Sequence, residues 1–379
     1  MIAGLTAQQR ESRAAFRRFA DEAIAPRADD FDREERLPPE LVARLAREGY
    51  LGANVPPEYG GLGLDALTYG LLHEEVGRAC SSVRSLLTVH AMTAHALQRW
   101  GTREQKTKWL PRLASGETVA AFGLTEPEVG SDARSVAATA TVEGGSFVLD
   151  GRKKWVTFGQ GASLFLVFAK SDGRDCAFLV ERETPGLSVR PIHGMLGVRA
   201  SMLAELHLEG CRVPRENLVG REGAGFSYVA STALDLGRYT VAWGCVGIGQ
   251  ACLEASFEYA AERKQFGVFL REHQLIQRML TDMLAQVRAA RLLCHQAGAL
   301  REAGDPQSVT ETSIAKYFAS TVAARAAADA VQIQGARGCS AESPVQRYLR
   351  DAKIMEIIEG STQMQQITIA QSGYQEHAL

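Results

Sequence analysis

The residue whose position most clearly suggests chemistry is Glu359, which follows two isoleucines and precedes a glycine near the end of the chain. If this carboxyl group is buried at the end of an apolar helix, desolvation raises its pKa, which suits a general base. A solvated glutamate at a helix end would fit the same spacing and is the more common arrangement. The local pattern therefore leaves both interpretations open.

Three other segments carry groups that could bind a phosphate or a planar ring. Gly130 and Ser131 lie in a turn just after an apolar run, where backbone N–H groups and a hydroxyl could hold phosphate. Trp155 and Thr157 share one expected strand, so an indole face and a hydroxyl could contact a planar ring. Arg263 closes a helical pattern and could bind phosphate. A capped loop, a core tryptophan and an ordinary helix cap are the structural alternatives.

Signatures of several other enzyme classes are missing from the sequence. Gly223-Ala224-Gly225 and Gly247-Ile248-Gly249 both break the dinucleotide pattern Gly-x-Gly-x-x-Gly. His73-Glu74-Glu75 lacks the second histidine of a zinc protease, and neither a Walker-type lysine loop nor a Gly-x-Ser-x-Gly elbow occurs. Nicotinamide, NTPase, hydrolase and metalloenzyme functions are therefore disfavoured.

The composition sets further limits on location and partners. The chain has 379 residues, enough for two or three domains, and its 42 Lys+Arg against 44 Asp+Glu give a formal charge of −2. This balance argues against broad binding to nucleic acid or to an anionic membrane. No apolar run reaches the roughly 18 residues of a membrane span, and we find no secretion signal. The seven cysteines contain no Cys-x-x-Cys pair, so we expect reduced thiols, no metal site and a cytoplasmic protein.

The elements that must position these residues form three blocks. Helical periodicity runs from Thr6 to Ser115 and includes a capping box from Thr102 to Gln105. From Val119, short β-rich runs alternate with the turn pairs Gly144-Gly145 and Asp172-Gly173, which predict hairpins. The pattern is helical again after position 223. We therefore predict an α+β fold with a helical domain (1–118), a central β domain (119–222) and a C-terminal helical domain (223–379).

Taken together and in this order, the four segments resemble the acyl-CoA dehydrogenase family of flavoproteins, from the first helices to about Gln371. Supporting pieces are Trp109–Glu117, Leu196–Ser201 and Val213–Gly220. The resemblance implies a helical N-terminal domain, a β-barrel-like middle domain and a C-terminal four-helix bundle, with FAD between the last two. It also implies a homodimer or homotetramer.

The resemblance assigns flavin contacts in two groups. The first group belongs to the same chain and comprises Phe122, Leu124, Thr125, Gly130, Ser131, Trp155, Thr157, Ser361 and Gln363. The second group reaches the FAD of a neighbouring subunit and comprises Arg263, Phe266, Gln274, Gln332 and Gly335. The sequence departs from the family at Phe158, where an asparagine is usual, and at Ala336, where a glycine is usual. Phe158 is expected to alter the edge of the flavin-binding site, and Ala336 is expected to weaken one contact with the dinucleotide part of FAD.

The same resemblance assigns the catalytic pair. Glu359 occupies the position of the base in many members, and Arg238 matches the arginine that contacts it. Other members carry the base one helix earlier, where this chain has Gly237, which cannot act as a base. The implied reaction removes the α-proton of an acyl thioester with Glu359 while a hydride leaves the β-carbon for flavin N5. The electrons then pass to an electron-transfer flavoprotein or to O2.

A narrower resemblance concerns the substrate. Ala79–Ser85, Val241–Gly247 and Met355–Ser361 look like the acyl-carrier-protein-dependent dehydrogenases of polyketide extender-unit biosynthesis, which make hydroxymalonyl or methoxymalonyl units. We hypothesise that Trp243 shortens the acyl cavity for a small polar group, with core packing as the alternative. The competing functions are an acyl-CoA dehydrogenase of fatty-acid or branched-chain catabolism, a flavin oxidase or monooxygenase, and a catalytically idle flavoprotein. Retention of Glu359 and Arg238 disfavours the last two.

Overall fold

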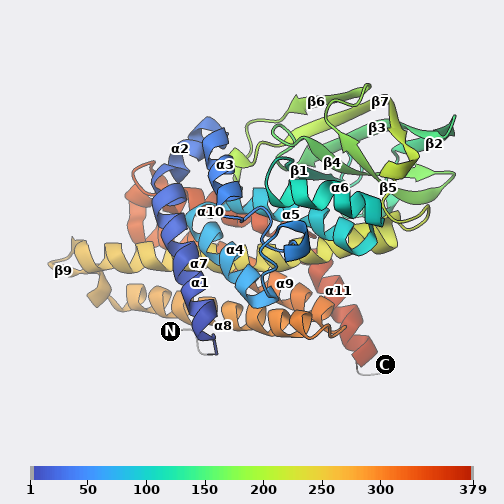
Figure 1. Cartoon of the computed structure of the whole chain (residues 1–379). Coiled ribbons are helices and arrows are strands. Elements are labelled where there is room, and N and C mark those ends of the chain that lie inside the picture. Colours follow the sequence, from blue (N-terminus) through green and yellow to red (C-terminus); the bar gives the residue numbers. More distant parts are fainter. Residues whose placement is uncertain (1–3, 377–379) are drawn as a thin grey trace.

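The computed structural model describes residues 4–376, and its first block is helical (Figure 1). The helices are α1 (Ala7–Phe19), α2 (Ala28–Glu34), α3 (Pro39–Arg47), α4 (Ala66–Ala79), α5 (Ser81–Trp100) and α6 (Arg103–Ala114). A π turn and a 3-10 turn join α1 to α2. The capping box predicted from Thr102 and Gln105 opens α6 and is confirmed.

The second block is a seven-stranded mixed sheet. Its strands are β1 (Ala120–Gly123), β2 (Thr139–Glu143), β3 (Ser146–Val156), β4 (Leu164–Ser171), β5 (Arg174–Glu181), β6 (Leu187–Pro191) and β7 (Ala204–Pro214). They follow the order β1-β4-β2-β3-β7-β6, and β5 pairs with β4. Both predicted hairpins are confirmed, because Gly144-Gly145 joins β2 to β3 and Asp172-Gly173 joins β4 to β5, all with positive φ.

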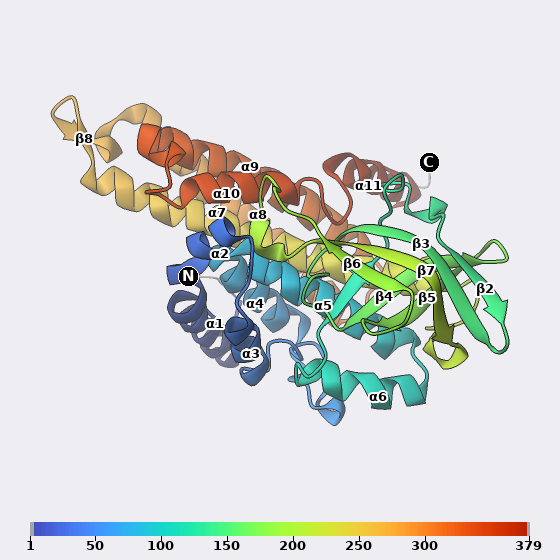
Figure 2. The ribbon, with the colours of Figure 1, turned by 90° about the horizontal axis from the view of Figure 1, so that it is seen from above.

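The third block is helical again and confirms the predicted α+β architecture. It contains α7 (Ser231–Glu262), α8 (Gln274–Glu302), α9 (Ser308–Gln334), α10 (Val345–Met355) and α11 (Thr362–Glu376). A short hairpin of β8 (Lys264–Gln265) and β9 (Val268–Phe269) follows α7, and both views show it at the end of the molecule opposite the sheet (Figures 1 and 2). Within residues 4–376, no helix is long and apolar enough to cross a membrane.

Helix α5 connects the sheet to the C-terminal helices and thereby positions the site. On one side, the His90 ring accepts a hydrogen bond from Ala120 N at 3.1 Å, and the Thr93 hydroxyl donates to Ala121 O at 3.4 Å. On the other side, the hydroxyls of Thr88 and Thr240 lie 3.0 Å apart, which joins α5 to α7. These four α5 and α7 side chains are buried, so the register between sheet and helices is fixed by satisfied interior hydrogen bonds.

Candidate active site

Glu359 lies in the turn between α10 and α11, in a backbone conformation that a glutamate rarely adopts. Its φ is +54°, in the left-handed region, and that of Gly360 is +84°. Lys316 of α9 donates from Nζ to Gly360 O at 2.7 Å, and Gln365 of α11 donates from Nε2 to Glu359 O at 3.0 Å. These two bonds hold the turn in a strained geometry, an arrangement often found at functional sites.

The Glu359 carboxylate is packed against Gly237 of α7. A Cβ atom built at Gly237 would lie 2.7 Å from the carboxyl carbon of Glu359 and 3.0 Å from Met92 Sδ, so only glycine leaves room for this carboxylate. The Oε2 atom of Glu359 is buried and has no hydrogen-bond partner. Residue 237 and Glu359 therefore occupy neighbouring positions in space, although they are far apart in the sequence.

Burial raises the pKa of Glu359 to about 7, although the positive charges of Arg238, Lys316 and Arg84 act in the opposite direction. Burial also lowers the pKa of Lys316 to about 8. A carboxyl group that titrates near neutral pH can take up a proton from a substrate and release it again.

The predicted partner Arg238 lies beside the same turn. Its Nε atom is buried without a hydrogen-bond partner and would lie 3.7 Å from a Cβ atom built at Gly360. The backbone N–H of Glu359 also makes no hydrogen bond to any residue between positions 4 and 376. The two residues predicted to be catalytic, Glu359 and Arg238, are thus close together. Glu359 Oε2 is an acceptor without a partner, and Arg238 Nε and the Glu359 backbone N–H are donors without a partner among the described residues.

The segment that carries the predicted flavin contacts is anchored by a buried ion pair. Lys153 of β3 donates from Nζ to Glu126 Oε1 at 2.6 Å, and Ala137 N and Ala138 N donate to the same carboxylate. Burial raises the pKa of Glu126, but the bond from Lys153 and the two backbone bonds outweigh this and hold the pKa below its usual value. The loop after β1 is therefore tied to β3 by a charged contact inside the protein.

The same strand presents Trp155 beside that loop. Lys154 N donates to Thr125 O at 2.8 Å, which places the Thr125 backbone next to the position of Trp155. The Trp155 side chain is 45% exposed, in contrast to the core tryptophans Trp109 and Trp243. An accessible indole next to a backbone-rich loop is suited to a planar ring bearing phosphates.

The remaining predicted contacts of the first group differ in accessibility. Gly130, Ser131 and Gln363 are exposed, and Leu124 is buried; the half-buried residues are Phe122, Thr125, Thr157 and Ser361. Ser361 accepts a hydrogen bond from Met364 N and opens α11. Phe158, which departs from the family pattern, is buried with φ +57°, and its ring packs against Gly161. Phe158 is thus a core residue rather than part of an open rim.

The second predicted group lies elsewhere. Arg263, Phe266, Gln274, Gln332 and Gly335 are all exposed, and Phe266 is 95% exposed at the tip of the β8–β9 hairpin. Gln334 donates to Ala255 O at 3.4 Å, which joins the end of α9 to the hairpin end of α7. The 32 residues of α7 extend about 48 Å at the usual rise. One chain therefore does not bring these five residues to Trp155.

Trp243 packs in the core, which is the alternative that the sequence left open. A Cβ atom built at Gly70 of α4 would overlap with the Trp243 indole, and the His295 ring of α8 lies 5.4 Å from it. Trp243 is fully buried among these contacts. It therefore fills the core between α7, α4 and α8, whereas Gly237 and Thr240 form the side of α7 that faces α5.

Several residues around the site were not assigned from the sequence. Arg84 and Lys316 are buried cations within helices, and Glu126 with Lys153 forms a buried pair. Arg84 and Lys316 could have been found in the sequence, because each is a single charged residue at a core position of a helical pattern. The Glu126–Lys153 pair gives no such signal, because its members come together only when β3 pairs in the sheet.

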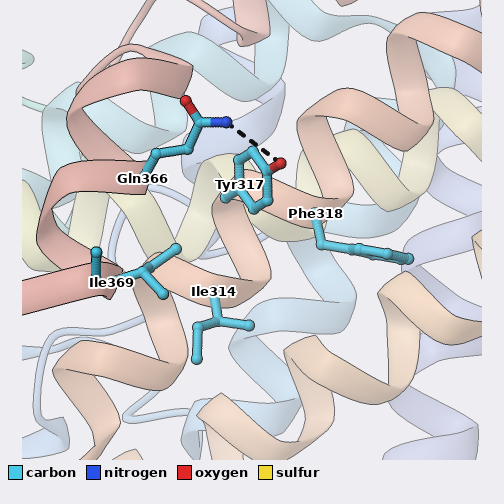
Figure 3. A pocket seen from close by; sticks show the side chains of 6 residues that line it. Ile314, Tyr317, Phe318, Gln366 and Ile369 are labelled. Carbon is cyan, nitrogen blue, oxygen red and sulfur yellow. Dashed lines mark hydrogen bonds between the residues drawn. The ribbon is translucent and has the colours of Figure 1, made fainter. Parts of the chain in front are cut away.

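Two surface grooves lie away from Glu359. An apolar groove of about 410 Å³ between α9 and α11 is lined by Ile314, Tyr317, Phe318, Gln366, Ile369 and Ala370, and Figure 3 shows the Gln366 amide bonded to the Tyr317 hydroxyl. A more polar groove lies between the end of α2 and β6. Neither groove includes Glu359. Between residues 4 and 376, no group of three or more His, Cys, Asp or Glu could hold a metal ion.

Family models and curated relatives match almost the whole chain. The N-terminal, middle and C-terminal domains of acyl-CoA dehydrogenases match residues 6–117, 121–211 and 223–374. An acyl-CoA dehydrogenase of Bacillus subtilis is 38% identical over 97% of this chain and 98% of its own length. The mitochondrial short-chain specific acyl-CoA dehydrogenase of mouse is 39% identical over 94% of this chain and 88% of its own length.

Solved structures that match almost the whole chain have the same fold. A glutaryl-CoA dehydrogenase from Mycobacterium smegmatis in complex with FADH2 has a TM-score of 0.93 at 30% identity, covering 97% of this chain and 95% of its own. FkbI, for biosynthesis of a methoxymalonyl extender unit, has a TM-score of 0.88 at 36% identity (96% and 99%). The prolyl acyl carrier protein oxidase AnaB has a TM-score of 0.92 at 30% identity (97% and 99%). The chain belongs to the acyl-CoA dehydrogenase family, FAD-dependent oxidoreductases that act on acyl thioesters.

Proposed function

We propose that this enzyme dehydrogenates a short acyl thioester carried by an acyl carrier protein, with Glu359 as the base that removes the α-proton. The observation that carries the assignment of the base is the Glu359 carboxylate, whose Oε2 is buried without a partner against Gly237. With its pKa raised to about 7, this carboxylate can accept a proton at neutral pH.

The surrounding residues supply the other requirements of the reaction. The unused backbone N–H of Glu359 is available to donate to the thioester oxygen, which stabilises the charge that develops as the α-proton leaves. Arg238 and Lys316 favour the ionised form of Glu359 before the reaction. Trp155, Thr157 and the loop held by the Glu126–Lys153 pair would hold FAD, which supplies the acceptor for the β-hydride.

The carrier-protein part of the proposal is supported by two structural relatives. FkbI and AnaB, which serve an extender-unit pathway and a prolyl carrier protein respectively, match this chain over almost its full length. The segments Ala79–Ser85 and Val241–Gly247, on which the narrower resemblance rests, lie on α4, α5 and α7, and α7 also carries Gly237, which packs against the Glu359 carboxylate. We therefore favour a carrier-bound acyl group.

A second candidate is an acyl-CoA dehydrogenase of fatty-acid or branched-chain catabolism. The observation that favours it is the 39% identity to a short-chain specific acyl-CoA dehydrogenase. The two candidates use the same base and differ in the carrier of the acyl group.

The experiment that separates them presents one short acyl group on CoA and on a phosphopantetheinylated acyl carrier protein. Under anaerobic conditions, we expect kcat/KM for flavin reduction to be higher with the carrier protein by about ten-fold or more, since only that substrate adds protein contacts. Equal or faster reduction by the CoA thioester would contradict the carrier assignment. Reoxidation by an electron-transfer flavoprotein, compared with O2, then identifies the acceptor.

We further propose that the enzyme works in the cytoplasm as a homodimer or homotetramer. The exposed hairpin with Phe266 and the apolar groove between α9 and α11 support self-association, since both present apolar side chains to solvent. In such an assembly, Arg263, Gln274, Gln332 and Gly335 would reach the flavin of a neighbouring copy.

A further inference from the structure

The family resemblance includes Leu196–Ser201, a segment that has no part in the reaction proposed above. We call residues 196–202, which connect β6 to β7, the β6–β7 segment. Two of its residues have left-handed backbones, Val198 with φ +53° and Met202 with φ +50°. A β-branched residue such as valine is strained in this conformation and keeps it only where surrounding contacts hold it. The contacts of the segment therefore have to account for its shape.

One end of the β6–β7 segment is bound to α10. Asp351 of this helix accepts a hydrogen bond from Val198 N at 2.6 Å. A Cβ atom built at Gly197 would lie 2.3 Å from Arg350 O, so the backbone of the segment touches the backbone of the helix. Asp351 precedes Glu359 by only eight residues. The contact with Asp351 is thus close in the chain to the turn that carries the base.

The other end of the β6–β7 segment is bound to the residues that follow β3. Phe158 N donates to Ser201 O at 2.8 Å. Phe158 comes directly after Thr157, which is a predicted flavin contact together with Trp155. A single short segment therefore joins the helix that leads to Glu359 with the end of the strand that carries the predicted flavin contacts.

Asp351 makes the contact with α10 at a cost in free energy. Its side chain is 2% exposed, and burial raises its pKa to about 6, although Arg347 and the backbone hydrogen bond act in the opposite direction. Two arginines of α10 pair with other carboxylates, Arg347 with Asp29 and Arg350 with Asp32. Among the residues that the structure describes, no cation lies within the 4.0 Å of an ion pair with Asp351. Because burying a carboxylate this way is costly, stability alone accounts poorly for it.

We infer that Asp351 is a positioning residue, which fixes Glu359 relative to the strand end that carries Trp155 and Thr157. The inference rests on the proposed function, in which the α-proton and the β-hydride leave neighbouring carbons of one thioester. The base and the hydride acceptor must then be held at a set separation, and an error of about 1 Å can cost about a hundred-fold in rate. The hydrogen bond from the β6–β7 segment to Asp351 resists such a shift between the two sides of the site.

The test compares two substitutions of Asp351. Asp351→Ala removes the hydrogen bond, whereas Asp351→Asn keeps an oxygen that can accept from the same N–H. Per bound flavin, Asp351→Ala should slow anaerobic flavin reduction by about ten-fold or more, and Asp351→Asn by less. Deuterium at the β-carbon should slow Asp351→Ala by a larger factor than wild type, because hydride transfer over a longer gap is more sensitive to isotope mass. Asp29→Asn weakens another contact of α10 and should keep the wild-type rate and isotope effect.

Amide hydrogen exchange of the substrate-free holoenzyme supplies a measurement that does not depend on activity. Loss of the Asp351 carboxylate should speed exchange at Val198 N and also at Phe158 N, which lies at the other end of the β6–β7 segment. Exchange at Ala120 N, which is bound to the His90 ring, is the internal reference and should stay unchanged.

Three results would each overturn the inference. Slower flavin reduction with an unchanged isotope effect would mean that Asp351 only maintains the fold. Asp351→Asn as slow as Asp351→Ala would mean that its charge matters and not its hydrogen bond. Unchanged exchange at Phe158 N would mean that the segment does not connect the two sides.

If Asp351→Ala does not fold, Asp351→Asn decides. A neutral acceptor holds the N–H less tightly than a carboxylate, so this variant should still show a larger isotope effect than wild type. A wild-type isotope effect in Asp351→Asn would then overturn the inference alone. Absence of flavin reduction by any thioester in the wild type would overturn the proposed function itself.

Discussion

The turn that carries Glu359 combines two features that cost free energy. A non-glycine residue at positive φ costs about 1 kcal/mol or more, and a carboxylate oxygen that is buried without a hydrogen-bond partner, here Oε2, adds a desolvation penalty. Lys316 and Gln365 stabilise the turn through its carbonyl oxygens and not through the carboxylate. The carboxylate is therefore left free for a substrate.

The pH dependence of flavin reduction tests the protonation state of Glu359. The pKa of Glu359 is raised to about 7, and only the deprotonated form can act as base. The rate of anaerobic flavin reduction should rise about ten-fold per pH unit below that pKa and level off above it. Stopped-flow measurements between about pH 5 and pH 9 check this, and a flat profile would contradict it.

The same raised pKa predicts how Glu359→Gln affects stability. A raised pKa in the folded state means that folding favours the protonated form, so stability falls as pH rises through about 7. Because glutamine does not titrate, Glu359→Gln removes this pH-dependent loss of stability. The Tm difference between variant and wild type should therefore be larger at about pH 8 than at about pH 5. A variant that is less stable than wild type at the higher pH would show that the folded protein favours the charged form.

Gly237→Ala tests the close contact between α7 and the carboxylate. The added methyl group would lie 2.7 Å from the Glu359 carboxyl carbon, so the carboxylate must move. Flavin reduction should slow by about ten- to a hundred-fold, since small misplacements of a base are costly. Gly249→Ala, on the same helix but against Val287, is the control and should retain activity. Equal rates of flavin reduction in Gly237→Ala and Gly249→Ala would contradict the close contact between Gly237 and the Glu359 carboxylate.

At the scale of elements, β3 holds the loop that is predicted to bind the flavin through Lys153. Lys153→Met would leave the buried Glu126 carboxylate without its cation and loosen the loop that carries Thr125. FAD affinity should fall by about ten-fold or more, as measured by flavin fluorescence on titration of the apoprotein. Lys170→Met, on β4 and in no ion pair between residues 4 and 376, is the control. Unchanged affinity in Lys153→Met would contradict the anchoring role.

The elements were largely predictable because their signals are local. Turn pairs such as Gly144-Gly145 and the capping box at Thr102 depend on a few neighbouring residues, and the structure has both. For Trp243 the sequence left two roles open, because periodicity does not say which neighbour a fully apolar helix face packs against, and the structure shows it packed in the core. The relation of Gly237 to Glu359 could be suspected from the family resemblance, but the direct contact depends on how α7 packs against the turn after α10.

At the scale of the whole molecule, α7 separates two sets of predicted flavin contacts. Trp155 lies in the sheet, and Arg263 lies at the hairpin end of α7, with most of this long helix between them (Figures 1 and 2). Both sets can serve a flavin only if a second copy supplies one of them. Self-association and FAD binding should therefore be linked.

Arg263→Ala tests this link. Because Arg263 is exposed in the single chain, its loss should leave the fold intact and lower FAD affinity by about ten-fold, through the contact with a neighbouring copy. FAD titration together with light scattering measures affinity and mass. Arg33→Ala, exposed on α2, is the control. Wild-type FAD affinity in Arg263→Ala, or a monomeric holoenzyme, would contradict the shared site.

The most direct test of the central claim is anaerobic mixing of a short acyl thioester with the wild-type holoenzyme and with Glu359→Gln at equal flavin content. The glutamine keeps the size of the side chain but cannot accept the α-proton. The account predicts rapid loss of flavin absorbance in the wild type and a rate at least about a thousand-fold lower in the variant. Undiminished loss of absorbance in Glu359→Gln would show that another group removes the proton.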